Sequence, residues 1–149
     1  MPTRQAVVRQ LQGITFAAKA DSNHWVIMDG SAAFGGSGAG VSPKELLLFA
    51  LGGCTGNDVV PILLKKRVSL DGFETRLTAT VQEEHPQVYT DIHIEYVFYG
   101  SAIKPVDVER AIELSLTKYC SVTAMLRKCV NITHSYRIET TKPAVEPAR

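Results

Sequence analysis

The strongest constraint on the fold is the segment 42–67, the longest apolar run of the chain, which carries Cys54 near its middle. Ser42 suits the N-cap of a helix, Pro43 suits the first helical position, and Glu45 completes a capping box with the serine. The apolar side chains that follow point to every face, unlike those of a surface helix. The sequence therefore predicts a long central helix that is enclosed on all sides.

The composition favours one globular domain over residues 1–149, because 45% hydrophobic side chains can build a core without metal or disulfides. The net charge is +1, and no basic stripe with interleaved aromatic residues occurs, so nucleic acid is not an expected partner. No segment resembles a signal peptide, and Gly, Asn, Asp and Pro interrupt the apolar run. We therefore expect a cytoplasmic protein that does not enter the membrane.

Strands are predicted on both sides of the central helix. Residues 4–30 have the pattern of an antiparallel meander, and residues 73–99 that of a hairpin with alternating apolar side chains. Residues 105–127 predict a pair of helices, residues 131–140 predict a last strand, and the tail 142–149 is expected to be flexible. This order predicts the α+β class, with antiparallel sheets packed around the helix.

A glycine-rich loop at residues 35–41 leads into the central helix. Such a loop before a helix N-terminus can bind phosphate, but this one lacks the Gly-Lys-Ser/Thr ending of a P-loop. It also lies too far from the preceding strand to form a dinucleotide-binding turn. We expect a flexible flap over the start of the helix instead.

Three cysteines, Cys54, Cys120 and Cys129, are the candidates for chemistry. In a cytoplasmic protein they are reduced core residues, metal ligands or redox groups rather than a disulfide framework. The four histidines have no spacing that gathers ligands on one element, so we expect neither a metal nor a cofactor. For Cys129 the simplest interpretation is a small buried hydrophobic residue.

A cysteine peroxidase needs an attacking thiolate, a group that stabilises it, and a second cysteine that resolves the sulfenic acid. Cys54 and Cys120 could form this pair, or both could be core residues. Cys54 lies about 16 Å along the helix from its start, beyond the reach of the helix dipole, and Asp58 one turn later disfavours a thiolate. Cys120 precedes a short helix that begins at Ser121, so its pKa has the better local reason to be lowered.

Two motifs, SPKELLLFALGGCTGNDV and KYCSVTAML, together resemble the OsmC/Ohr family of osmotically induced and organic hydroperoxide resistance proteins, in its branch of OsmC-like redox proteins. The resemblance covers nearly the whole chain. It implies an intertwined homodimer, in which two central helices pack back to back and the active sites lie at the subunit interface. It also implies that Cys54 is the peroxidatic cysteine, Cys120 the resolving one, and a dithiol such as a lipoylated protein the reductant.

The chain differs from the family at two positions. The family glutamate ten residues before the first cysteine is Lys44 here, and Glu45 lies one position further on. The two regions that can supply the family's active-site arginine contain none. We hypothesise that Lys44, Lys19 or His24 replaces the arginine, and we keep Glu45 and Asp58 as further supporting residues.

Two alternative functions on the same fold follow from these differences. One is a non-catalytic dimeric protein that binds a small hydrophobic ligand in an apolar pocket. The other is a thiol redox sensor that uses the same cysteine pair without turning over much peroxide. The leading interpretation is a thiol peroxidase that reduces organic hydroperoxides in the response to oxidative stress.

Overall fold

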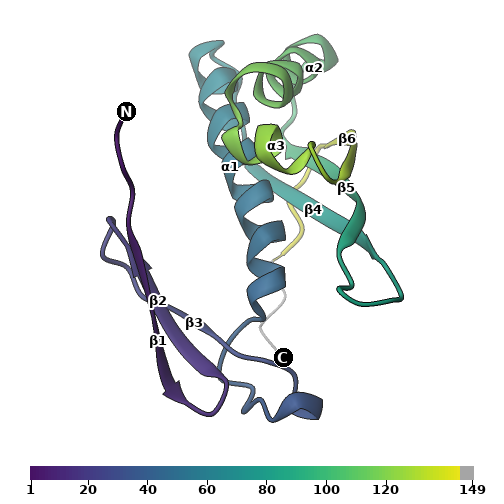
Figure 1. Ribbon diagram of the computed structural model, residues 1–149. Helices are drawn as coiled ribbons and strands as arrows, with labels where there is room; N and C mark the ends of the chain where they lie inside the picture. The colour runs from purple at the N-terminus through teal and green to yellow at the C-terminus, as the bar shows by residue number, and fades with distance from the viewer. Residues whose placement is uncertain (145–149) are drawn as a thin grey trace. The chain divides into compact units, whose positions relative to one another are not determined.

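The computed structural model of the protein describes residues 1–144. They form two compact units, residues 1–49 and the residues from 50 onward, and each is described by itself (Figure 1). The last five residues of the predicted flexible tail, 145–149, lie outside the described residues. That the whole chain acts as one domain stays a prediction.

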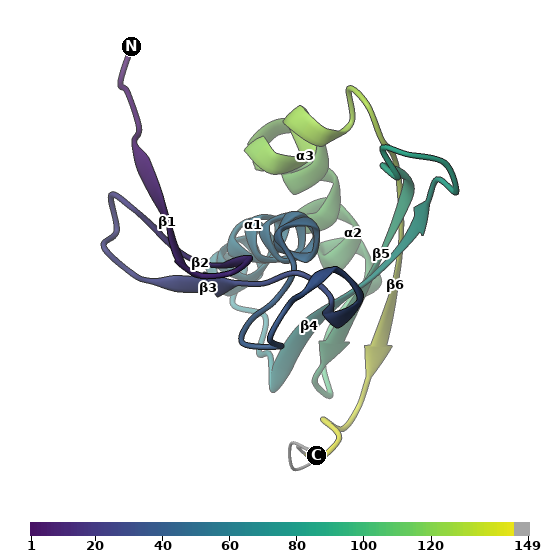
Figure 2. The same cartoon turned by 60° about the horizontal axis from the view of Figure 1, so that its bottom comes forward.

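The first unit contains a three-stranded antiparallel sheet in the order β1-β2-β3 (Figure 2). Its strands are β1 (Ala6–Gln12), β2 (Thr15–Ala20) and β3 (Val26–Met28). Gly13 joins β1 to β2 with a φ of 54°, a left-handed conformation that glycine adopts without a steric penalty. This sheet is the meander that the sequence predicts.

The glycine-rich loop is attached to this unit by a backbone bridge and by hydrogen bonds to the Asp29 side chain. After a short 3₁₀ turn, η1 (Ala32–Phe34), the chain returns to β3, where Met28 forms a parallel bridge with Val41. The Asp29 carboxylate accepts hydrogen bonds from the backbone N–H groups of Ser37 (3.0 Å) and Ala39 (3.1 Å). The expectation of a flexible flap is therefore wrong, because a buried carboxylate that the sequence pattern did not mark holds the loop.

Helix α1 (Pro43–Lys65) lies within the predicted segment and begins with the predicted capping box. The Ser42 N–H donates to Glu45 Oε2 at 2.7 Å, and the Glu45 N–H donates to Ser42 Oγ at 3.3 Å. Lys65 ends the helix, where its positive charge suits the helix dipole. Local sequence thus determines both ends of α1.

In this chain α1 is not enclosed on all sides. One face is buried, through Leu51, Gly52, Thr55, Val59 and Leu63. Several large apolar side chains outside that face are exposed, including Leu47 at 45%, Phe49 at 56% and Leu64 at 58%. The prediction of an enclosed helix is wrong for the single chain.

Length and mean hydropathy alone would also allow α1 to cross a membrane. The helix has 23 residues, its best window has a mean hydropathy of 1.6, and 28% of that window is buried. The expectation that its polar residues and proline exclude a membrane span is therefore not supported by composition. The core helix of a soluble protein satisfies the same criteria, so the distinction depends on the fold in which α1 packs.

The second unit contains a sheet in the order β4-β5-β6, whose strands are β4 (Gly72–Val81), β5 (Tyr89–Tyr99) and β6 (Asn131–Glu139). β4 and β5 form the predicted antiparallel hairpin. β6, however, pairs with β5 in parallel, so the expectation of antiparallel sheets is wrong for this strand. Parallel neighbours need a long crossover, and the helices between β5 and β6 supply it.

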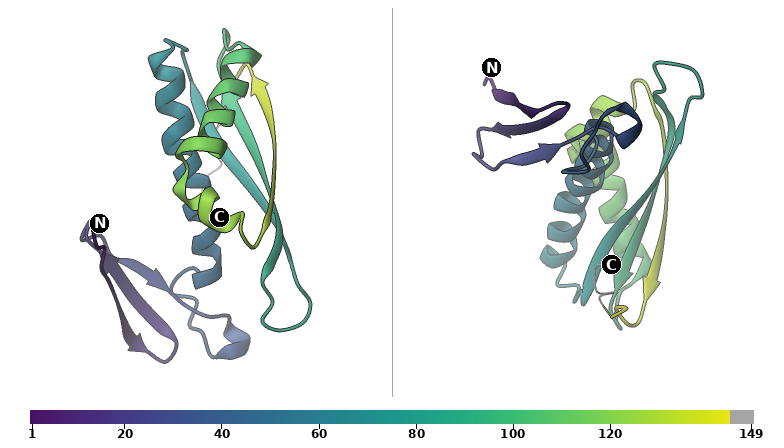
Figure 3. Two further views of the ribbon diagram at one scale, coloured as in Figure 1. Left: turned by 45° about the horizontal axis from the view of Figure 1, so that its top comes forward. Right: turned by 90° about the horizontal axis from the view of Figure 1, so that it is seen from below.

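The crossover consists of α2 (Pro105–Leu114), the π-helical turn η2 (Ser115–Tyr119) and α3 (Ser121–Leu126). The sequence predicts a helix pair here, but not the π turn that joins the two helices. Figure 3 shows these helices and the C-terminal part of α1 on one face of the sheet. The core between them is formed by fully or nearly fully buried apolar side chains: Leu51, Val59, Leu63, Ile92, Ile94, Phe98, Val108, Ala111 and Ile112.

Candidate active site

Cys54 lies in the middle of α1 and is half-buried. Its Sγ is 4.0 Å from the Oγ of Ser121, the first residue of α3. The contact therefore joins the central helix to the start of the last helix. A hydroxyl at this distance can donate to sulfur when the thiol is deprotonated.

Cys120 lies between η2 and α3 and is buried, with 3% of its surface exposed. Its Sγ caps α3 by accepting a hydrogen bond from the Thr123 N–H at 3.4 Å. Burial nevertheless raises the pKa of the Cys120 thiol, and the neighbouring Cys54 side chain raises it further. The expectation of a lowered pKa is thus wrong, because the loss of hydration outweighs the favourable helix start.

The fold brings Cys54 and Cys120 together, although 66 residues separate them in the chain. Each side chain interacts with the other, since the Cys54 thiol contributes to the raised pKa of Cys120. Both cysteines are free thiols in this structure. Cys54 and Cys120 are therefore the pair of thiols that this site offers for chemistry.

A chain of buried hydroxyl groups runs next to the thiols. Thr55 Oγ1 lies 2.7 Å from the Tyr96 hydroxyl and 2.9 Å from Ser115 Oγ, and Ser115 donates to Asp58 Oδ2 at 2.9 Å. Tyr96, Thr55 and Ser115 are each fully buried. Burial raises the pKa of Tyr96 to about 12, with smaller contributions from the nearby Cys120 and Asp58, so its hydroxyl is protonated at neutral pH.

A cleft of about 260 Å³ lies beside this series of hydroxyl groups. It is formed by the C-terminal half of α1 and by the end of η2, through Asn57, Asp58, Pro61, Ile62, Lys65 and Tyr119. Asp58 belongs both to the cleft and to the hydroxyl chain. The predicted supporting residue Asp58 therefore lies near the cysteine pair, one helical turn after Cys54.

The other predicted supporting residues belong to the first unit. Lys44 and Glu45 are in the first turn of α1, about 15 Å along the helix from Cys54, and Glu45 serves as a cap. Lys19 donates to Asn23 at 2.7 Å and lies 5.0 Å from the centre of the Trp25 ring. His24, the third candidate for the cation, lies in the loop before β3.

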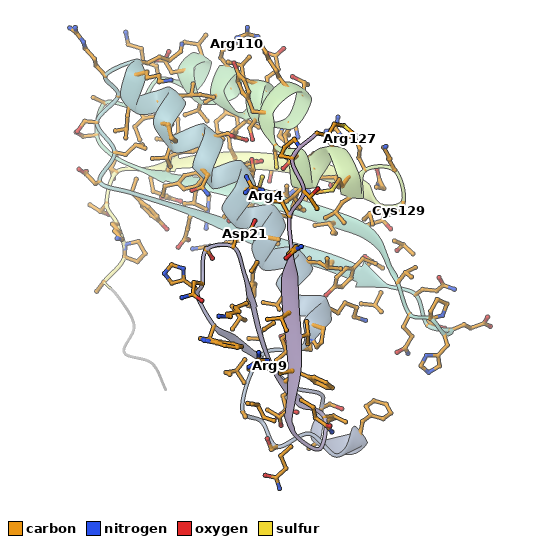
Figure 4. All side chains as sticks on the ribbon, turned by 60° about the vertical axis from the view of Figure 1, so that its left-hand side comes forward. Arg4, Arg9, Asp21, Arg110, Arg127 and Cys129 are labelled. Atoms are coloured by element: carbon orange, nitrogen blue, oxygen red, sulfur yellow. The ribbon has the colours of Figure 1, made fainter. Side chains whose placement is uncertain are left out.

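Cys129 lies on the loop between α3 and β6 (Figure 4). It is exposed, and its thiol donates to the Leu126 carbonyl at 3.4 Å. The interpretation of Cys129 as a buried residue is therefore wrong.

Among residues 1–144, no three His, Cys, Asp or Glu side chains gather closely enough to hold a metal ion.

Sequence reasoning did not identify the hydroxyl groups that lie near the thiols, those of Thr55, Tyr96, Ser115 and Ser121. Thr55 and Tyr96 do carry a signal, since each places a hydroxyl among buried apolar neighbours, where it needs a partner. Ser115 carries no such signal, because its partners lie 57 and 60 residues away in the sequence.

Gly52 and Gly56 allow α1 to pack closely on β4. A Cβ at either position would lie within 3.2 Å of β4 side chains.

Together, the fold and the site define a small α+β protein with two neighbouring thiols, one on a long helix and one after a π turn. The profile of OsmC-like proteins matches residues 35–135, which is more than half of the chain. The chain belongs to the OsmC family, as the resemblance of its motifs predicted. The family membership identifies α1 as the core helix of a soluble domain rather than a membrane span.

Relatives of known sequence or structure agree with this assignment. Protein YhfA of Escherichia coli is 42% identical over 134 residues, which cover 90% of this chain and 97% of YhfA. A crystal structure from Aquifex aeolicus has 31% identity and a TM-score of 0.83, and the match covers 95% of this chain and all of that one. An organic hydroperoxide resistance protein OsmC from Legionella pneumophila has the same fold, with 12% identity, a TM-score of 0.67, and coverage of 91% and 97%.

Proposed function

We propose that this protein is a thiol peroxidase that reduces organic hydroperoxides, with Cys54 as the attacking thiol and Cys120 as the resolving thiol. The observation that supports the proposal is the contact of Cys54 Sγ with Ser121 Oγ at 4.0 Å, next to Cys120, together with the electrostatic interaction of the two thiols. Two structures of similar fold, from Legionella pneumophila and Bacillus subtilis, are named as organic hydroperoxide resistance proteins, which supports the substrate class.

The reaction has three steps. The Cys54 thiolate attacks the terminal peroxide oxygen, the O–O bond breaks, and the alkoxide takes a proton to leave as the alcohol. Cys54 is then a sulfenic acid. The Cys120 sulfur displaces its hydroxyl group, which leaves as water with the Cys120 proton, and a disulfide forms. A dithiol, such as the lipoyl group of a carrier protein in the cytoplasm, reduces this disulfide and is itself oxidised.

The environments of the two cysteines support these roles. Cys54 is half-buried, whereas only 3% of Cys120 is exposed, so peroxide reaches Cys54 more easily. The raised pKa of Cys120 keeps it protonated at neutral pH. A protonated thiol is a poor nucleophile, so Cys120 remains available until the sulfenic acid has formed.

We propose that Lys44, Lys19 or His24 supplies the cation that favours the Cys54 thiolate. Lys44 lies about 15 Å along α1 from Cys54, so it would act from a second copy of the chain. Peroxide turnover by Lys44→Ala, Lys19→Ala and His24→Ala proteins would be compared with the wild type. A variant that keeps the wild-type rate removes its residue from this role.

A homodimer is part of the proposal, because it would cover the apolar side chains that α1 exposes. Gly53 offers a test: it is exposed, and a Cβ added there meets no atom of this chain within 4 Å. In a monomer, Gly53→Ala should stabilise the helix by about 1 kcal/mol. Weaker self-association in analytical ultracentrifugation would support a second copy against this face, whereas a stabilised monomer would contradict it.

The catalytic proposal is tested by intact-mass analysis and peptide mapping after stoichiometric cumene hydroperoxide. We expect the wild type to lose two hydrogens as a Cys54–Cys120 disulfide, and Cys120→Ser to trap oxidised Cys54. Cys129→Ser is the matched control, and it should behave like the wild type. Thiols that stay reduced in all four proteins, including Cys54→Ser, would exclude peroxidase activity.

A second candidate function is the binding of a small hydrophobic ligand. An open groove of about 450 Å³ is lined by glycines of α1 and by Phe73, Glu74 and Thr75 of β4. Its size is within the range of small-molecule sites. Binding would be favoured if the thiols were unreactive and the melting temperature depended on the ligand. A redox sensor would be favoured if the disulfide exchanged with protein thiols faster than it formed from peroxide.

A further inference from the structure

Ser115 contacts both parts of the molecule that carry the thiols. It opens the π turn η2, and its carbonyl accepts the Cys120 N–H at 2.9 Å. Its hydroxyl donates to Asp58 and contacts Thr55, both on α1. Thr55 follows Cys54 directly and Asp58 lies one turn later, so a single residue connects the Cys120 backbone to the turn of α1 that carries Cys54.

The hydroxyl chain can have only one direction. Ser115 uses its proton for Asp58, so its oxygen must accept the proton of Thr55. Thr55 then has no proton left, and its oxygen must accept the proton of Tyr96. Tyr96, at the start, only donates, whereas Thr55 and Ser115 each accept one hydrogen bond and donate one. The chain of hydroxyls ends at the Asp58 carboxylate. The rotamer of Ser115 is therefore determined by partners on both sides.

The segment that Ser115 holds has an unusual shape. A π turn is rare, and such turns are frequent at functional sites. Arg127 also stabilises this segment, because its Nη2 donates a hydrogen bond to the Leu116 carbonyl of η2 at 2.6 Å. Arg127, labelled in Figure 4, directly follows α3, the helix that Cys120 caps. Ser115, by contrast, forms hydrogen bonds from the turn to α1.

We infer that Ser115 is a positioning residue for the formation of the disulfide. This inference rests on the proposed function. The Ser115 hydroxyl holds the π turn against α1, so that Cys120 stays beside Cys54 after the Cys54 sulfenic acid has formed and until the disulfide closes. Without the hydroxyl, the turn can move away from α1, and Cys120 spends less time within reach of Cys54. The attack of peroxide on Cys54 does not need this contact.

The test measures both steps in the wild type, Ser115→Ala and Tyr96→Phe. Tyr96→Phe is the matched control, because it removes a buried hydroxyl of the same chain but leaves Ser115 bound to Asp58 and Thr55. Rapid quench and mass analysis after cumene hydroperoxide give the rate of Cys54 oxidation and the rate of disulfide closure. We expect Ser115→Ala to slow closure about tenfold, because small displacements strongly reduce the effective concentration of a reacting group.

In the same experiment, the rate of Cys54 oxidation should change by less than about twofold in Ser115→Ala, and both rates by less than about twofold in Tyr96→Phe. A merely structural role would not separate the two steps in this way. Closure at the wild-type rate in Ser115→Ala would overturn the inference, as would equal slowing by Tyr96→Phe. If Ser115→Ala does not fold, Thr55→Ala removes one of the two α1 partners of Ser115, and a smaller slowing is expected.

A second measurement separates this inference from the proposed function. In a second equilibrium, oxidised dithiothreitol converts the Cys54 and Cys120 thiols into the disulfide and is itself reduced. Its constant reports how well the two thiols are placed, without any peroxide. Ser115→Ala should lower that equilibrium constant about tenfold relative to the wild type and Tyr96→Phe. If Cys54 does not react with peroxide but this difference is found, the peroxidase proposal fails and the positioning role stands. An unchanged constant would overturn the positioning role.

Discussion

Two aspartates, one in each unit, gather hydroxyl groups, but they use them differently. Asp29, only 2% exposed, accepts from Thr15 and Ser37 side chains and from the N–H groups of Gly30, Ser37 and Ala39. Asp58 is half-buried, and the hydroxyl of Ser115 leads from it into the core. The first carboxylate orders a loop, and the second orients a line of side chains.

The difference between the two sites follows from their donors. Backbone N–H groups cannot find another partner easily, so the loop around Asp29 depends on one carboxylate. The Thr55 and Ser115 hydroxyls near Asp58 have two partners each, so each of them keeps one partner when the other contact is lost. We therefore expect changes at Asp29 to affect stability most, and changes near Asp58 to affect the geometry of the thiols. The following predictions test this contrast, beginning with the largest expected effect.

Asp29→Ala should lower the melting temperature by about 10 °C, since it leaves several backbone and hydroxyl donors without an acceptor. Differential scanning calorimetry measures the change. Asp29→Asn is the control: it keeps one carbonyl oxygen and the same shape, so it should lose less than Asp29→Ala. Equal melting temperatures for Asp29→Ala and the wild type would show that the loop does not depend on this carboxylate.

Acid should weaken the same site. Hydrogen bonds, chiefly from the Ser37 hydroxyl, lower the pKa of Asp29 to about 2 from 3.8. A carboxylate with a lowered folded pKa contributes stability above its unfolded pKa, and this contribution is lost as the pH falls from about 4 to about 2. Trp25, the single tryptophan, reports on this unit by fluorescence. The difference in stability between wild type and Asp29→Asn should shrink over this window; a difference that stays constant contradicts the assignment.

Tyr96→Phe should destabilise the protein by about 1 to 2 kcal/mol, because it removes the donor at the start of the buried hydroxyl chain. Urea unfolding measures this change. Tyr136→Phe is a suitable control, since the Tyr136 hydroxyl contacts Glu109 at 2.7 Å in an exposed position. Its effect should stay below about 0.5 kcal/mol. Equal losses for the two variants would mean that the buried chain adds nothing specific.

Thr15→Val tests the smallest effect, at the edge of the Asp29 site. The Thr15 hydroxyl lies 3.2 Å both from Asp29 Oδ2 and from Ser37 Oγ, and Ser37 and the backbone remain bound when it is lost. We expect a loss of about 1 kcal/mol in urea unfolding. Thr78→Val, on an exposed position of β4, should change stability by less than about 0.5 kcal/mol. A loss at Thr15 as large as that of Asp29→Ala would remove the contrast between carboxylate and hydroxyl.

Local signals in the sequence determined the class of the fold and much of its element order. The capping box at Ser42 and Glu45, the proline that opens α2 and the alternation in β5 each involve residues a few positions apart. Such signals act within one element, so they can be read before the tertiary structure is known. The motifs around Cys54 and Cys120 also identified the OsmC family correctly.

Only the tertiary structure decided how these elements meet. It paired β6 with β5 in parallel, tied the glycine-rich loop to Asp29, and gave Ser115 its partners on α1. It also reversed the expected direction of the pKa shift of Cys120. Burial and hydrogen bonding between distant segments depend on which surfaces the folded chain brings together. For that reason, the identity of the thiols could be read from the sequence, whereas their environment could not.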